Sequence, residues 1–92
     1  MDAEVIDNAG LNRFELVLGD ATATADYRID GDTIILTHTN VPPALGGQGV
    51  GTRLAEGVFE AVRASGRKIV PECPFMAKFA ASHPAYADLI AD

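Results

Sequence analysis

The chain has 92 residues and a formal net charge of −6, and 48% of its residues are hydrophobic. This length is typical of one domain with one modest core, and the apolar content excludes a disordered chain. Thirteen acidic residues against seven basic ones disfavour a nucleic-acid binder. No apolar run approaches the roughly 20 residues of a membrane span, and a single cysteine permits no internal disulfide. We therefore expect one cytoplasmic domain over residues 1–92 that binds neither nucleic acid nor membranes.

Four strands are predicted in the first half of the chain. Alternation of apolar and polar residues with period two is typical of a half-buried strand, and it is clearest over residues 22–30. Segments rich in Gly, Asn and Asp separate the strands and are typical of turns. The predicted strands span residues 3–8, 13–18, 22–30 and 33–39.

A helix, a strand and a second helix are predicted in the second half. Apolar residues recur at helical spacing over 50–65, and Gly66 is suited to follow the helix end. Gly57 costs that helix about 1 kcal/mol relative to Ala, which indicates close packing. A strand at 68–70 would run parallel to 33–39 after a helical crossover, and a helix at 75–82 would end before Pro84. The elements predict an α+β fold, three-layer-like, with a mostly antiparallel sheet of about five strands and one parallel pair.

The most informative segment lies between the strand at 33–39 and the helix at 50–65. Four of its residues, Gly46, Gly47, Gly49 and Gly51, let the backbone approach a ligand closely. Free N–H groups at a helix start, together with the positive end of the helix dipole, favour an anion such as phosphate. We therefore expect a phosphate-bearing ligand here. The alternative is an ordinary glycine-rich turn between a strand and a helix.

Two familiar phosphate-binding loops fit this segment poorly. A P-loop requires a lysine, and none lies between Gly46 and Thr52. A dinucleotide-binding loop requires a third glycine where Leu54 stands, and it follows a parallel strand, whereas hairpins are predicted here. Nucleotide hydrolysis and dinucleotide binding are therefore not expected.

A third loop fits better. Gln48-Gly49-Val50-Gly51 resembles the pyrophosphate-binding motif of the acetyl-CoA-dependent N-acetyltransferase (GNAT) superfamily, although Gly46 stands where most members have Arg or Gln. The resemblance extends to a small single-domain subfamily over nearly the whole chain. Its motifs are matched by the sequences DYRI at 26–29, HTNVP at 38–42, VPECPF at 70–75 and HPAYADL at 83–89.

This resemblance implies a minimal acetyltransferase fold that binds acetyl-CoA. A splayed pair of parallel strands, here 36–41 and 69–72, would grip the pantetheine, with backbone groups of Val41 pairing with it. The helices and strands that build much of the family's acceptor pocket have no room in this chain. The acceptor side should be open, and a homodimer or a partner protein would complete it. The pyrophosphate would be held by Gly46, Gly47, Gln48, Gly49, Val50, Gly51 and Thr52.

Cys73 and His38 are the candidate catalytic residues. Cys73 ends the last strand beside the expected thioester, where it can donate a proton to the leaving thiolate or carry the acetyl group. The alternative is a small buried hydrophobe. His38 can accept a proton from an amine near neutral pH; with period two it shares a face with Ile34, Leu36 and Asn40. The alternative for His38 is a core or hydrogen-bonded histidine.

Asn40, Glu72 and Tyr86 are the candidate substrate-binding residues. Asn40 stands where the subfamily usually has Glu, so it can orient a substrate but cannot act as a base. Glu72 is the nearest alternative carboxylate. Tyr86 can act as an acid, although such a segment more often closes a helix, and Phe79 stands where many members have a proton-donating Tyr. No metal is expected, because the suitable ligand types include no closely spaced pair.

We expect an N-acetyltransferase that moves an acetyl group from acetyl-CoA to an amine of a small molecule or a protein. The alternative is a CoA or acyl-CoA binding module without turnover, acting as a subunit or regulator. The missing acceptor elements and Asn40 favour the module. Cys73 and His38 favour the enzyme.

Overall fold

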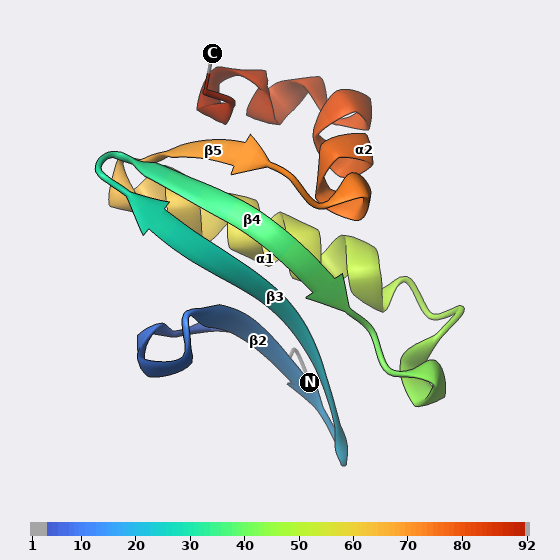
Figure 1. The fold of residues 1–92 in the computed structure, drawn as a ribbon. Helices are drawn as coiled ribbons and strands as arrows, with labels where there is room; N and C mark the ends of the chain where they lie inside the picture. Colours follow the sequence, from blue (N-terminus) through green and yellow to red (C-terminus); the bar gives the residue numbers. More distant parts are fainter. Residues whose placement is uncertain (1–3, 92) are drawn as a thin grey trace.

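The computed structural model describes residues 4–91, which form a five-stranded sheet with helices packed against it (Figure 1). The strands lie in the sheet in sequence order. The first four are antiparallel neighbours, and β5 joins β4 in parallel. The elements are β1 (Val5–Asn8), β2 (Arg13–Leu18), β3 (Ala21–Asp30), β4 (Thr33–Asn40), α1 (Val50–Ser65), β5 (Lys68–Pro71), α2 (Pro74–Ser82) and the 3-10 helices η1 (Ala9–Leu11), η2 (Pro43–Leu45) and η3 (Pro84–Leu89).

The predicted order of elements and the mostly antiparallel sheet with one parallel pair are confirmed. The predicted bounds of β2 and α1 match the structure, and those of β3, β4, β5 and α2 differ from it by one residue at one end. The first strand begins later than predicted, at Val5. Ala3, where its start was predicted, lies outside the described residues. Within residues 4–91, no helix is long and apolar enough to cross a membrane.

Helix α1 packs closely against the sheet. Its buried residues recur at helical spacing. A Cβ added to Gly57 would lie 2.2 Å from Cγ2 of Val5 in β1, which confirms the close packing predicted there. The helix ends at Gly66, whose φ of 81° is in the left-handed region that favours glycine. The buried residues of α1 are Val50, Leu54, Ala55, Val58, Phe59 and Val62.

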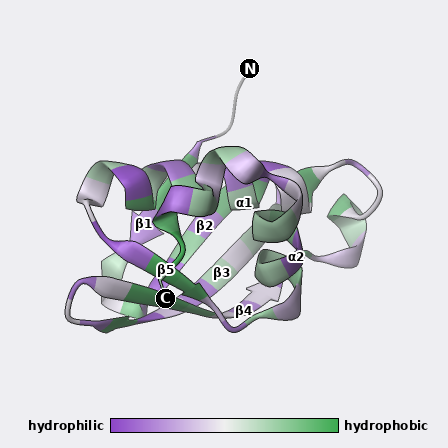
Figure 2. Ribbon diagram, turned by 90° about the horizontal axis from the view of Figure 1, so that it is seen from above, coloured by the Kyte–Doolittle hydropathy of each residue, from purple (hydrophilic) through white to green (hydrophobic). Residues whose placement is uncertain are grey.

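One hydrophobic core lies between the helices and one face of the sheet. The ring of Phe59 in α1 lies 5.1 Å from that of Phe79 in α2, so both helices contribute to this core. Both helices lie on the same side of the sheet (Figure 2). On the other face, Ile6 and Val17 are 57% and 48% exposed. The strand residues buried in the core are Phe14, Leu16, Ala23, Ala25, Tyr27, Ile34, Leu36 and Ile69.

A β-bulge in β4 changes which side chains share a face. Tyr27 of β3 pairs with Leu36, but Asp26 pairs with His38, so Thr37 is an extra residue. The extra residue reverses the alternation of side chains along β4. His38 and Asn40 therefore lie on the helix-free face of the sheet, whereas the buried Leu36 points toward the helices. The prediction that His38 and Asn40 share a face with Ile34 and Leu36 is therefore wrong. Thr39, which pairs with the buried Ala25, faces the helices instead.

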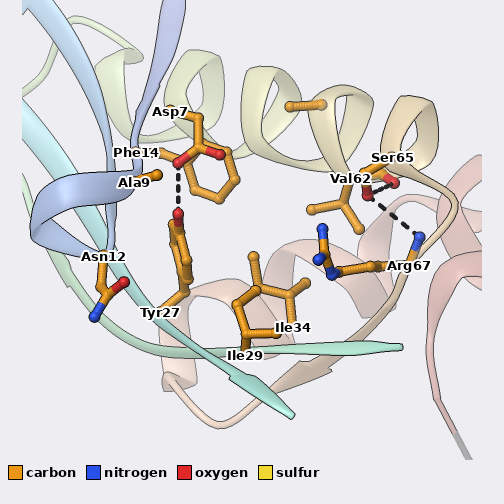
Figure 3. A pocket seen from close by; sticks show the side chains of 11 residues that line it. Asp7, Ala9, Asn12, Phe14, Tyr27, Ile29, Ile34, Val62, Ser65 and Arg67 are labelled. Carbon is orange, nitrogen blue, oxygen red and sulfur yellow. Dashed lines mark hydrogen bonds between the residues drawn. The ribbon is translucent and has the colours of Figure 1, made fainter. Parts of the chain in front are cut away.

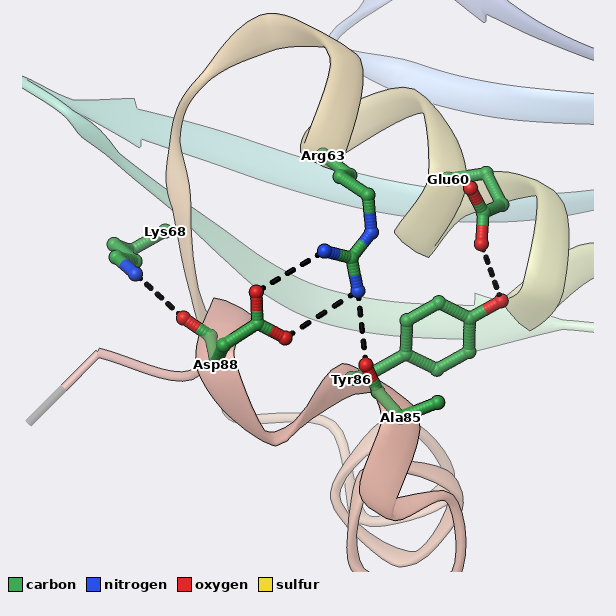
Figure 4. A network of polar contacts seen from close by, with 6 residues as sticks. All are labelled: Glu60, Arg63, Lys68, Ala85, Tyr86 and Asp88. Atoms are coloured by element: carbon green, nitrogen blue, oxygen red, sulfur yellow. Dashed lines mark hydrogen bonds and ion pairs between the residues drawn. The ribbon is translucent and has the colours of Figure 1, made fainter.

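A polar network fastens η3 to α1 (Figure 4). The Arg63 guanidinium donates to both carboxylate oxygens of Asp88, at 3.0 and 3.3 Å, and to the carbonyl of Ala85 at 2.9 Å. The hydrogen bond from Arg63 lowers the pKa of the Asp88 carboxyl. The N–H of Ala91 donates to the carbonyl of Ile69 at 2.8 Å. The C-terminal segment therefore covers the outer edge of β5, which would otherwise be an unpaired sheet edge.

Candidate functional site

Strands β4 and β5 separate at their C-terminal ends. Their register runs only as far as Leu36 and Pro71. The N–H of Cys73 still donates to the carbonyl of Leu36 at 2.9 Å, and the chain then turns into α2, while β4 continues to Asn40. Residues 37–40 therefore pair with no strand on the β5 side, and Cys73 contacts only Thr39 among them. The remaining backbone groups of this edge can pair with an extended ligand. We call this opening the fork; it corresponds to the splayed pair that the family resemblance implies.

Cys73 lies at the base of the fork, at the N-cap of α2, and is only 6% exposed. Its Sγ lies 3.2 Å from Oγ1 of Thr39, within hydrogen-bond distance. Burial raises the pKa of the Cys73 thiol, but Thr39 and the backbone N–H groups of Met76 and Phe75 lower it more, so the net shift is downward from 9.0. The thiol of Cys73 is thus a stronger acid than the thiol of an ordinary cysteine.

The glycine loop runs from η2 into the start of α1. Gly47 and Gly49 have φ of 77° and 72°, in the left-handed region that glycine adopts readily. Gly49 is the N-cap of α1, and no side chain caps this helix start. A Cβ added to Gly47 or Gly49 would meet nothing within 4 Å. The backbone here is therefore open for an anion to approach, as a bound pyrophosphate requires.

Gly51 has a packing role that the sequence did not reveal. A Cβ at this position would lie 2.8 Å from Cζ of Phe75, so the aromatic ring sits directly on the start of α1. Phe75 is 40% exposed and borders a hollow of about 240 Å³ that is also lined by Thr52 and Lys78. Lys78 thus places a positive charge near the glycine loop. Neither Phe75 nor Lys78 was predicted as a site residue, because the sequence does not show that α2 packs beside the loop.

The helix-free face carries polar side chains next to the fork. His38 and Asn40 are exposed there, and His38 is directly opposite Asp26 on β3. Among residues 4–91, Asp26 forms no ion pair. Glu72, by contrast, forms an ion pair with Arg28, in which Oε2 lies 3.7 Å from Nη2. Asp26 was not predicted as a site residue, because its pairing with His38 depends on the bulge in β4.

The remaining predicted residues occupy different places. Val41, which directly follows β4, is half-buried against the core. Nε2 of Gln48 donates to the carbonyl of Ala44 at 3.4 Å, so this side chain turns back onto the loop. Tyr86 donates to Glu60 of α1 at 2.8 Å. Burial first, and then Glu60, raise the pKa of Tyr86 to about 12. Within the described chain, no three His, Cys, Asp or Glu side chains gather as a metal site.

Comparisons with known proteins agree with this geometry, in which a forked sheet meets a glycine loop at a helix start. The GCN5-related N-acetyl-transferase family matches residues 13–89. The structure is similar, with a TM-score of 0.74 and 33% identity, to the NMR solution structure of a GCN5-like protein from Staphylococcus aureus that has been proposed to be an N-acetyltransferase; the match covers 97% of this chain and 88% of that one. No curated protein matches the sequence. The fold is that of the GNAT class of acetyltransferases, and the chain belongs to the GCN5-related N-acetyltransferase family.

Proposed function

We propose that the protein binds acetyl-CoA in the fork and along the glycine loop, and transfers the acetyl group to a primary amine. Acetyl-CoA would supply the acetyl group as an activated thioester. The observation that carries this proposal is that the unpaired edge of β4, the start of α2 and the start of α1 lie at one end of the sheet (Figure 1). Cys73 is the N-cap of α2 and is buried there. A ligand held by both the loop and the fork would reach Cys73.

Binding would depend mainly on the backbone. The free edge at the end of β4, together with the backbone of Val41 that follows it, would pair with the pantetheine amides. The backbone N–H groups around Gly47 and Gly49 would hold the pyrophosphate, since the space beside these glycines is open and the dipole of α1 favours an anion. The N–H of Gly46 already donates to the carbonyl of Pro43 at 3.1 Å, so Gly46 would contribute through the shape of the loop. The hollow beside Phe75 and Lys78 would take the nucleotide end, with Lys78 offsetting phosphate charge.

The acceptor amine would approach from the helix-free face. Asp26 carries an unpaired negative charge among residues 4–91 and would attract an ammonium group. His38, directly opposite, would take the proton that makes the amine nucleophilic. Asn40, on the same face, would orient the acceptor, and Glu72 would line the rim. Asp26 and Asn40 would thus position the amine, and His38 would take its proton, as direct attack of an amine on a thioester requires.

Cys73 would donate a proton to the departing thiolate. Its lowered pKa makes the thiol a stronger acid than an ordinary cysteine, which favours donation of its proton to the thiolate. We assign proton donation to Cys73, not transient attachment of the acetyl group. A side chain that is 6% exposed and in contact with Thr39 leaves little room for an acetylated sulfur.

The open acceptor side also bears on partners and location. A second copy of the chain or a partner protein would cover the helix-free face and enclose the acceptor. We propose a homodimer as the simplest arrangement, in the cytoplasm, where acetyl-CoA is available and a lone thiol stays reduced. Light scattering at several concentrations would show whether the protein dimerises.

The Cys73→Ala variant tests this function. We expect turnover to fall about 100-fold, as for loss of an acid–base group, with an unchanged acetyl-CoA dissociation constant. The assay follows CoA release with a panel of amines and lysine-containing proteins. Thermal melting establishes that the variant is folded.

Unchanged turnover in Cys73→Ala would contradict the catalytic role of this residue. Binding of acetyl-CoA without acetylation of any amine in the panel would instead favour the module without turnover. His38→Gln is the matched test on the acceptor side. It should reduce turnover near neutral pH, where most of the acceptor amine is protonated and needs a base, and leave acetyl-CoA binding unchanged.

A further inference from the structure

A cavity of about 240 Å³ lies at the end of α1 remote from the glycine loop (Figure 3). The 16 residues of α1 separate its ends by about 24 Å, so the cavity is distinct from the fork. Its walls come from the core, where Phe14, Ile34 and Val62 are 3%, 4% and 2% exposed. Its rim carries Asp7, Asn12 and Arg67. Apolar walls with a few polar groups at the rim are typical of small-ligand sites.

A hydrogen bond fixes one end of the cavity. The hydroxyl of Tyr27, which is 7% exposed, donates to Oδ1 of Asp7 at 2.6 Å. Burial first, and then Asp7, raise the pKa of Tyr27 to about 12, so the hydroxyl stays uncharged at neutral pH. This end therefore carries the negative charge of Asp7 and disfavours an anion.

Arg67 provides the opposite charge at the other end. Oγ of Ser65 accepts a hydrogen bond from the N–H of Arg67 at 3.2 Å and donates to the carbonyl of Val62 at 2.7 Å, which fixes the backbone after the helix. The guanidinium extends over the cavity toward Ile34 (Figure 3). Among residues 4–91, no carboxylate lies within ion-pair distance of it. A positive charge beside an apolar space favours an anionic group on a ligand.

We propose that this cavity binds a small apolar carboxylate, whose carboxylate group pairs with Arg67 and whose apolar body lies between Phe14, Tyr27 and Ile34. Asp7 sets the orientation, because it repels the carboxylate from the other end. The volume lies below the usual range for drug-sized ligands, so the ligand is small, with a body about the size of one aromatic ring. The site shares no residue with the proposed acetyl-CoA site, and the inference holds whether or not the chain is an active acetyltransferase.

Titration of the ¹⁵N-labelled protein with benzoate, followed by NMR, tests this proposal. We expect saturable shifts of the backbone amides of Ala9, Asn12, Ala61 and Arg67, but none in the glycine loop. Benzamide, the neutral analogue, should bind about tenfold more weakly because it lacks the charge-assisted pair. Arg67→Gln should weaken benzoate binding about tenfold as well. The matched control Arg28→Gln, on the helix-free face, should bind benzoate like the wild type.

A second variant tests the cavity itself. Ala61→Leu fills space at the wall and keeps Arg67, so it should abolish benzoate binding while its amide spectrum remains that of a folded protein. Three results would each overturn the proposal: no saturable shift with benzoate, equal binding of benzamide, or wild-type affinity in Arg67→Gln. None of these results bears on acetyl-CoA binding at the fork.

Discussion

Thr39 contacts the thiol of Cys73 and helps to lower its pKa. Replacing Thr39 with Val removes the hydroxyl and keeps the shape, so the pKa of the Cys73 thiol should rise. The fraction of thiolate at neutral pH should then fall. Titration of the ultraviolet absorbance of the thiolate measures this shift directly.

Thr37→Val is the matched control for this prediction. The Thr37 hydroxyl donates to the carbonyl of Asp26 at 3.3 Å and has no hydrogen bond to Cys73. This variant should therefore leave the thiol pKa unchanged. If Thr39→Val also titrates like the wild type, the contact with Thr39 does not tune the thiol.

The burial of Tyr27, and after it the hydrogen bond to Asp7, should make stability depend on pH in the alkaline range. In the folded state the pKa of Tyr27 is raised from 10.0 to about 12, so its contribution is fully present below pH 10 and is lost as pH rises toward 12. Tyr27→Phe should be less stable than the wild type by about 1 kcal/mol at pH 7. Urea unfolding at several pH values should show this difference shrinking between pH 10 and 12. A difference that stays constant over that range would contradict the assigned cause of the shift.

At the scale of elements, the contact between α1 and β1 depends on the missing side chain of Gly57. A Cβ there would lie 2.2 Å from Cγ2 of Val5. Gly57→Ala should therefore destabilise the protein by about 1–3 kcal/mol, although Ala favours a helix by about 1 kcal/mol. Thermal unfolding measures the change. Adding Val5→Ala should recover most of the loss, and Gly10→Ala, whose Cβ would meet its nearest atom at 3.8 Å, serves as control. Equal stability of Gly57→Ala and the wild type would show that β1 moves away freely.

Most elements could be predicted from the sequence, because their signals are local. Period two identifies the strands, helical spacing identifies α1, and Gly66 marks the end of that helix. The bulge in β4 could not be predicted, because Thr37 continues a β-branched run without any turn residue to mark it. That one extra residue decides that Thr39, and not His38, faces Cys73.

The candidate site was predictable in part for the same reason. The glycine loop is contiguous in sequence, so its position at the start of α1 follows from the glycines and the helical pattern together. Asp26, Thr39 and Lys78 each reach the site through packing or register between distant segments. No local pattern reports such a pairing, so these residues appear only in the structure.

For the whole molecule, the two faces of the sheet have different proposed roles, one in binding acetyl-CoA and the other in admitting the acceptor. The helices cover one face and leave the other open next to the fork (Figure 2). This places the proposed acetyl-CoA loop beside α1 and gives an acceptor access from the helix-free face. The cavity beside Arg67 lies at the far end of α1, so a ligand there would not block the fork.

The most direct measurement for this account is a calorimetric titration of acetyl-CoA into the wild type, Gly49→Val and Gly31→Val. Gly49 and Gly31 have similar φ, 72° and 61°, so both substitutions impose similar backbone strain, but only Gly49 lies at the proposed pyrophosphate site. We predict saturable binding by the wild type and Gly31→Val, and at least an approximately tenfold loss of affinity in a folded Gly49→Val. No binding to the wild type at millimolar acetyl-CoA, or equal affinity in Gly49→Val, would contradict the claim that the glycine loop holds acetyl-CoA.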